Sequence, residues 1–191
     1  PRHVLGGKGY ISPSDKLNIA GVGVRKWGMG ANNLSQCETE NIVALCDVDQ
    51  KQAASTYQKY PKAKVYKDFR IMLENQKDID AVIVATPDHN HAMITMLAMK
   101  MGKHVYCQKP LTHTVYEARM ITEAAKKYKV QTQMGNQGHS SDEIRSLKEW
   151  IDDDAIGAVR EVFAWTDRPV GGHEWDTFAV KAMSKDKPPI P

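Results

Sequence analysis

The 191-residue sequence lacks the features that mark several large classes of protein. It has three cysteines, Cys37, Cys46 and Cys107, and no Cys-x-x-Cys spacing, so a zinc site or a redox dithiol is not indicated. No apolar run approaches the roughly 18 residues that a membrane-spanning helix needs, so a membrane partner is not expected. No block of five or six lysines and arginines occurs, and the formal net charge is only +3, so nucleic acid is not an expected partner either.

Short apolar runs alternate along the chain with residues at helical spacing. Continuous apolar runs, rather than alternating ones, are typical of strands that are covered on both faces. Helices that connect such strands favour parallel pairing with right-handed crossovers. The pattern therefore predicts an α/β fold with a doubly wound parallel sheet of about six strands. The expected strands are residues 17–22, 42–46, 64–66, 81–85, 104–107 and 130–134.

Several helix starts are marked by capping residues. Thr114-x-x-Glu117 and Ser140-x-x-Glu143 have the capping-box spacing, and Asp49-x-x-Gln52 is a related N-cap pattern. Apolar residues at helical spacing follow the first two, over residues 118–128 and 144–151. Helices are expected after each of these starts.

Changes in composition and hydrophobic pattern along the sequence predict three segments. Residues 1–15 are rich in Gly, Pro and Ser and are expected to form an extended leader. Residues 16–157 are expected to form the α/β domain. Residues 158–191 begin with an alternating pattern typical of a half-exposed antiparallel strand, and we interpret them as the start of a second, truncated domain. Without sheet partners, that strand would expose Val162, Phe163 and Trp165.

A glycine-rich turn follows the first expected strand. Gly21 and Gly23 occupy the first two places of the dinucleotide fingerprint G-x-G-x-x-G, in which a helix N-terminus faces the pyrophosphate. The third place is Lys26, and Gly28 and Gly30 follow, as if the turn were lengthened. A flexible glycine turn with no ligand is the alternative.

An acidic residue follows the second expected strand. Asp47 lies about 20 residues beyond the glycines, where a carboxylate can accept hydrogen bonds from the adenosine ribose. A solvated aspartate at a strand end is the alternative, but the order of strand, glycine turn, helix, strand and acid favours a dinucleotide cofactor.

Polar stretches also follow three later strands, at residues 85–92 (ATPDHNHA), 105–114 (VYCQKPLTHT) and 133–140 (QMGNQGHS). Taken with the glycine turn and "CDVD", their order resembles that of the glucose–fructose oxidoreductase / inositol dehydrogenase / MocA family, from about Lys16 to about Pro169. The resemblance implies a Rossmann domain that binds NAD(P), followed by an α/β domain with a large open sheet that carries much of the sugar site and the oligomer interface.

The resemblance also implies roles for individual residues. Lys109 matches the lysine of the family's Glu-Lys-Pro motif, which polarises or deprotonates the reacting hydroxyl, and a partly desolvated lysine can do this. Two departures stand out: Lys26 replaces a glycine and Gln108 replaces the glutamate. The implied cofactor-binding residues are Gly21, Gly23, Gly28, Gly30, Asp47, Thr86, Pro87, His91, Gln108 and Asn136.

Other roles stay open for some of these residues. Lys109 could be a surface lysine at a strand end, and His89 and His91 could simply begin a helix. The two histidines have no third ligand, so no metal is predicted. Met93, Met96 and Met99 have the spacing of core residues on a helix. Trp165 and Trp175 could border a sugar or lie in a strand or an interface.

The leading hypothesis is an NAD-dependent oxidoreductase acting on a hydroxyl of a sugar, polyol or glycoside, or the cofactor-binding portion of one. NADP is less favoured because Asp47 would repel a 2′-phosphate. One alternative is a redox-neutral, NAD-dependent glycosidase that oxidises C3 transiently, and another is a non-catalytic dinucleotide-binding remnant. The resemblance implies a homo-oligomer for full-length relatives. The opening residues resemble those of exported family members after a twin-arginine signal, which implies the periplasm, with the cytoplasm as the alternative.

Overall fold

The structure, a computed structural model, describes residues 12–163 and 165, and they divide into two compact units between Ser140 and Ser141. The first unit contains one six-stranded sheet with the order β3-β2-β1-β4-β5-β6. Every neighbouring pair of strands is parallel. The predicted doubly wound sheet is confirmed. Its strands are β1 (Asn18–Val22), β2 (Asn41–Cys46), β3 (Lys64–Tyr66), β4 (Ala81–Val84), β5 (His104–Gln108) and β6 (Thr132–Gly135).

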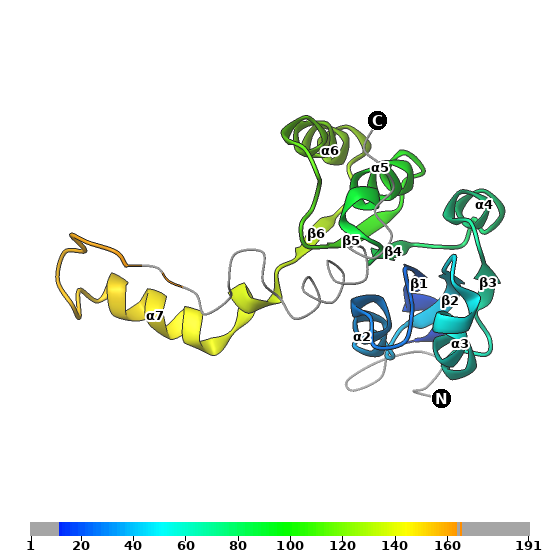
Figure 1. The fold of residues 1–191 in the computed structure, drawn as a ribbon, viewed down its shortest axis with the longest axis horizontal. Coiled ribbons are helices and arrows are strands. Elements are labelled where there is room, and N and C mark those ends of the chain that lie inside the picture. Colours follow the sequence, from blue (N-terminus) through cyan, green and yellow to red (C-terminus); the bar gives the residue numbers. More distant parts are fainter. Residues whose placement is uncertain (1–11, 164, 166–191) are drawn as a thin grey trace, which may run out of the picture. The chain divides into compact units, whose positions relative to one another are not determined.

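Helices connect successive strands, as parallel pairing requires. Short 3-10 turns, η1 (Pro13–Asp15), η2 (Asp88–Asn90) and η3 (Gln137–Ser140), add to them. Figure 1 shows α2 and α3 on the opposite side of the sheet from α5 and α6. The helices of the first unit are α2 (Met29–Ser35), α3 (Gln50–Lys59), α4 (Phe69–Asn75), α5 (His91–Lys100) and α6 (Val115–Tyr128).

The core forms two layers because strand side chains alternate between the faces of the sheet. On one face, Ile19, Leu45 and Ile83 pack with Leu34 of α2 and Ala53 of α3. On the other face, the intervening strand residues pack with α4, α5 and α6. Both faces are covered over the inner strands β1, β2, β4 and β5, which explains why these strands read as largely apolar runs, whereas the edge strands β3 and β6 are more exposed. The residues of the second layer include Ala20, Val22, Cys46, Val82, Val84, Cys107, Met72, Ile94, Met99 and Ile121.

The predicted caps of α3 and α6 are confirmed. The Asp49 carboxylate accepts hydrogen bonds from the backbone N–H groups of Lys51 and Gln52. Thr114 and Glu117 form a reciprocal capping box. The hydrogen bond from the Thr114 backbone is the largest of the effects that lower the pKa of Glu117. These side chains satisfy N–H groups that the first helical turn leaves without partners.

The second unit contains α7 (Asp142–Asp152), and here two expectations are wrong. The N-cap of α7 is Ser141, whereas Ser140 ends the preceding 3-10 turn. Residues 158–163 form no strand, because a strand needs a neighbouring strand to satisfy its backbone and the described residues of the second unit contain no other strand. The side chains of Val162, Phe163 and Trp165 are exposed, in keeping with the sequence analysis.

The segment boundaries stay predictions. The first compact unit ends at Ser140, which is earlier than the domain end expected at residue 157. Pro13–Asp15 form a 3-10 turn, and the rest of the expected leader, residues 1–11, lies outside the described residues, as does Trp175. Of the three methionines expected in the core, Met99 is fully buried, Met96 is partly buried, and Met93 is more than half exposed.

Candidate functional site

The carboxyl ends of all six strands meet at one edge of the sheet, because every strand is parallel to its neighbours. The direction of the connections reverses between β1 and β4, which is where open α/β sheets bind their ligands. The sequence-predicted residues follow the strands onto this edge. Gly23 comes after β1, Asp47 after β2, Thr86 after β4, Lys109 after β5 and Asn136 after β6.

The glycine turn packs closely against the strand beside it. Gly23 has a φ of +83°, and a Cβ there would lie 2.5 Å from the carbonyl oxygen of Ala85. A Cβ on Gly30, inside α2, would lie 2.1 Å from the carbonyl oxygen of Gly23. Gly30 therefore fills the role of the third fingerprint glycine, which allows the helix to approach the strand. The lysine at position 26 does not interrupt this packing, because the turn is longer and α2 begins only at Met29.

Asp47 supports the glycine turn from the next strand. Its Oδ2 accepts a hydrogen bond from the Val24 backbone N–H at 2.8 Å, and its Oδ1 accepts one from Asp49 N–H at 2.9 Å. Each carboxylate oxygen can accept a second hydrogen bond. The side chain is only partly buried, so it can hold the turn in place and still accept a hydrogen bond from a ribose hydroxyl.

A cavity of about 420 Å³ lies between the turn, Asp47 and the loop after β4. Larger hollows, of about 590, 510 and 640 Å³, lie along β2, between α2 and α3, and between α5 and α6, and all three are more open. The smaller cavity is the better candidate because it lies at the point where the strand order reverses. Its lining includes Gly23, Arg25, Asp47, Gln52, Lys67, Phe69, Thr86 and Pro87.

Thr86 provides an independent sign of a ligand in this cavity. Its hydroxyl oxygen is buried and has no hydrogen-bond partner within the described protein. Buried hydroxyls in folded proteins are nearly always paired. The Thr95 hydroxyl, in α5, is unpaired in the same way, but of the two residues only Thr86 lines the cavity, where a ligand could supply a partner. The unpaired hydroxyl and the close-packed glycines fit a dinucleotide.

His91 lies behind the predicted site. The first residue of α5, it is 1% exposed. Its Nδ1 lies 2.6 Å from the Pro110 carbonyl oxygen and its Nε2 lies 2.8 Å from the Thr86 carbonyl oxygen. Both ring nitrogens are therefore engaged by the backbone, and neither is left to contact a cofactor directly.

Gln108 is also buried, at 4% exposure. Its Nε2 donates to Oδ1 of Asn33, in α2, at 2.8 Å. A Cβ on Gly135, in the neighbouring strand β6, would lie 2.7 Å from the same Nε2, so the amide occupies the space that a side chain at position 135 would need. Gln108 thus connects β5 to the helix that follows the glycine turn.

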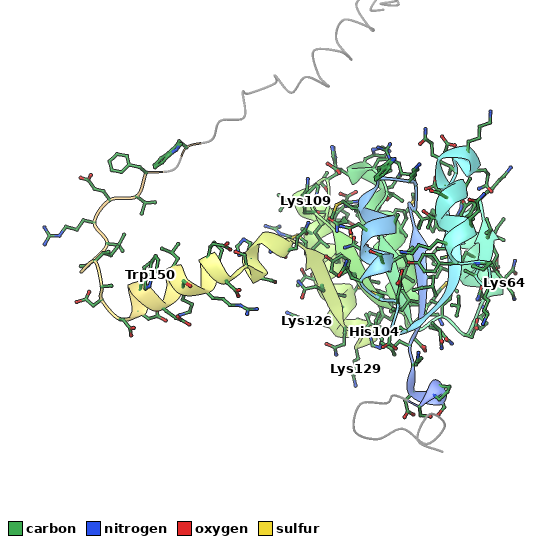
Figure 2. All side chains as sticks on the ribbon, turned by 90° about the horizontal axis from the view of Figure 1, so that it is seen from below. Lys64, His104, Lys109, Lys126, Lys129 and Trp150 are labelled. Atoms are coloured by element: carbon green, nitrogen blue, oxygen red, sulfur yellow. The ribbon has the colours of Figure 1, made fainter. Side chains whose placement is uncertain are left out.

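Lys109 is exposed beyond the end of β5 and does not line the 420 Å³ cavity. Figure 2 shows it at the opposite end of the strand from His104. The Lys109–Pro110 peptide bond is cis. Asn136 is partly buried after β6, and its backbone N–H donates to the Met134 carbonyl. The structure brings Gly23, Asp47, Thr86 and Pro87 together around one cavity and places Lys109 and Asn136 farther along the same edge.

Some lining residues were absent from the sequence-based prediction. Lys67 and Phe69 follow β3, so the rule that ligands bind beyond the carboxyl ends of strands could have indicated them. Arg25 lies within the glycine turn itself. The Gln108–Asn33 contact joins residues 75 apart in the chain and has no local signal.

Residues 12–163 and 165 contain neither a metal-binding group nor a membrane-spanning helix. No group of three or more His, Cys, Asp or Glu side chains there is arranged to hold a metal ion. None of the helices in that part of the chain has the length and apolar character needed to cross a membrane.

The fold and the carboxyl edge together define a dinucleotide-binding domain of the Rossmann type. The chain belongs to the glucose–fructose oxidoreductase / inositol dehydrogenase / MocA family of oxidoreductases, whose NAD-binding Rossmann-fold model matches residues 17–136.

Among curated proteins, the chain is similar to inositol 2-dehydrogenase of Salmonella typhimurium (strain LT2), with 30% identity over 148 residues, 74% of this chain and 43% of that protein. It is also similar to D-glucoside 3-dehydrogenase of Escherichia coli K12, with 29% identity over 149 residues, 78% of this chain and 42% of that protein. A solved structure, an NAD-binding oxidoreductase from Klebsiella pneumoniae, aligns with a TM-score of 0.64 and 29% identity and covers 74% of this chain and 40% of that one. The chain therefore spans less than half the length of these relatives.

Proposed function

We propose that this chain is the cofactor-binding portion of an NAD-dependent oxidoreductase that acts on a hydroxyl group of a sugar, polyol or glycoside. The observation that carries the proposal is the cavity at the reversal of strand order, with its close-packed glycine turn, Asp47 and the unpaired Thr86 hydroxyl. The substrate class rests on the relatives, which are an inositol dehydrogenase and a glucoside dehydrogenase.

Residues of this chain would hold the cofactor in the following way. The backbone of the glycine turn would accommodate the pyrophosphate, and the Asp47 carboxylate would accept hydrogen bonds from the adenosine ribose hydroxyls. The Thr86 hydroxyl would face the nicotinamide side. Bound NAD supplies the hydride acceptor, which no side chain can replace.

We propose NAD rather than NADP because the Asp47 carboxylate faces the cavity and would repel a 2′-phosphate. Arg25 and Lys67 also line the cavity, and their positive charges act in the opposite direction. The effect of Asp47 should outweigh that of the two cations, because the Val24 and Asp49 N–H groups hold its carboxylate in place. A hydrogen bond from the ribose to this charged group contributes about 1.5–3 kcal/mol to the binding of NAD.

We propose Lys109 as the residue that handles the proton of the reacting hydroxyl. In a full-length protein that contains this segment, Lys109→Met should lower kcat by about 10²–10⁴-fold, the usual range for a general acid or base. The dissociation constant for NADH should change little, because Lys109 does not line the 420 Å³ cavity. Lys103→Met is the matched control, since that lysine lies before the same strand at the other edge of the sheet. Turnover that survives Lys109→Met would remove this residue from the proton transfer.

The direct test of the function is sugar-dependent reduction of NAD by the full-length protein. Stoichiometric NADH formation with a sugar or polyol is expected. Glycoside cleavage without net NAD consumption would instead identify the redox-neutral glycosidase. The location in the periplasm is likewise a proposal, supported by the resemblance of the opening residues to exported members.

A further inference from the structure

His91 makes two contacts that constrain its protonation state. Both of its ring nitrogens lie within hydrogen-bond distance of a backbone carbonyl oxygen, Pro110 at 2.6 Å and Thr86 at 2.8 Å. A carbonyl oxygen can only accept, so each ring nitrogen has to donate. A neutral imidazole has a single N–H, and its other nitrogen would point a lone pair at a carbonyl lone pair. Only the doubly protonated ring satisfies both contacts.

These two carbonyls belong to different loops at the candidate site. Thr86 follows β4 and lines the cavity, whereas Pro110 follows Lys109 beyond β5. We call the pair of contacts the His91 bridge. It joins the loop beside the proposed nicotinamide position to the loop that bears the proposed proton-handling lysine.

The surroundings of the ring agree with a retained proton. Interaction with the nearby Cys107 side chain, in β5, is the largest effect that raises the pKa of His91. The carbonyls of Pro110 and Thr86 raise it further, burial opposes them, and the resulting pKa is about 9. The other ionisable residues within three positions of Thr86 or Pro110 outside β5 are Asp88, His89, Lys109 and His113, and all four are exposed.

We propose that His91 is an imidazolium cation at neutral pH and that it positions the Lys109 loop against the Thr86 loop. The residue is a positioning residue, since its nitrogens contact the backbone and not the cofactor. The relevance of the His91 bridge to catalysis rests on the proposed function above, but the protonation state of the His91 ring does not.

The bridge makes stability depend on pH with a defined sign. The pKa of His91 is raised in the folded state from 6.5 to about 9, so its contribution is fully present below pH 6.5 and is lost as the pH rises through 9. Over that interval the unfolding equilibrium constant should rise by up to about tenfold per pH unit, the limit for one proton. His91→Gln should remove this dependence, whereas His89→Gln, which changes an exposed histidine, should keep it.

The protonation state is measured directly by ¹⁵N NMR of the histidine side chains in the 191-residue chain. At pH 7.5, both ring nitrogens of His91 should carry protons. A spectrum with one protonated and one bare nitrogen at this pH would overturn the proposal. The measurement uses the unaltered chain, so it remains decisive if His91→Gln does not fold.

The positioning role is tested by amide hydrogen exchange. In His91→Gln, exchange at Leu111 and Thr112 should be faster, while exchange within β5 should stay slow. Unchanged exchange at these two amides would overturn the positioning role. An NADH titration of the unaltered chain separates the two proposals. If NADH does not bind, the proposed function is rejected, but the proposal that His91 is a cation still stands. If NADH binds and His91 is neutral, only the His91 bridge is rejected.

Discussion

Asp47 lies partly buried at the end of β2, and at the residue scale it serves the fold and the site together. Its two carboxylate oxygens accept hydrogen bonds from backbone N–H groups, one in the glycine turn and one at the start of α3. The same carboxylate lines the cavity. Gly30 has a comparable double role, because its missing side chain lets α2 approach the backbone of Gly23. The turn is therefore shaped by backbone contacts, and the extra residues between the glycines are tolerated.

Gly30→Ala tests this close approach. The added methyl would meet a backbone oxygen at 2.1 Å, which no rotamer change can relieve. Overpacking of this kind typically costs about 1–3 kcal/mol of unfolding free energy, measured by urea denaturation. Gly138→Ala is the matched control, because nothing lies within 4 Å of its added Cβ. Equal stability of the two variants would mean that Gly30 does not mediate the packing of α2.

At the scale of elements, strands and helix caps follow from local sequence, whereas the contacts between elements do not. The short segment Lys64–Tyr66 marks β3, and Asp49 and Thr114 mark the starts of α3 and α6, because each signal lies within a few residues of its effect. The sequence predicts the N-cap of α7 at Ser140, one residue before the N-cap in the structure, because Ser140 and Ser141 are both good N-cap residues.

Thr114→Ala tests the capping box of α6. The threonine oxygen accepts the Glu117 backbone N–H, and loss of such a cap usually costs about 1 kcal/mol of unfolding free energy. Ser140→Ala is the control, because that serine is not an N-cap in the structure. Urea denaturation of the two variants gives the comparison. A larger loss for Ser140→Ala than for Thr114→Ala would contradict the assigned caps.

At the scale of the whole molecule, the candidate site could be predicted only in part. The order of strands and polar stretches placed Asp47, Thr86 and Lys109 on one edge, because parallel strands all end there. The sequence could not reveal that His91 bridges two loops, or that Gln108 reaches Asn33, 75 residues away, since both depend on tertiary packing. Within the second unit, α7 carries an exposed apolar series, namely Ile144, Leu147, Trp150 and Ile151.

Binding of a nicotinamide dinucleotide to the 191-residue chain is the measurement that tests the central claim most directly. A fluorescence titration with NADH should show saturable binding. Binding of NADPH should be about tenfold weaker or more, which corresponds to about 1.4 kcal/mol or more from the Asp47 carboxylate. Asp47→Asn should narrow this preference, whereas Glu123→Gln, which removes an exposed charge on α6, should preserve it. Saturable NADH binding with this preference supports a cofactor site at the carboxyl edge. Failure of the folded chain to bind either dinucleotide would contradict it.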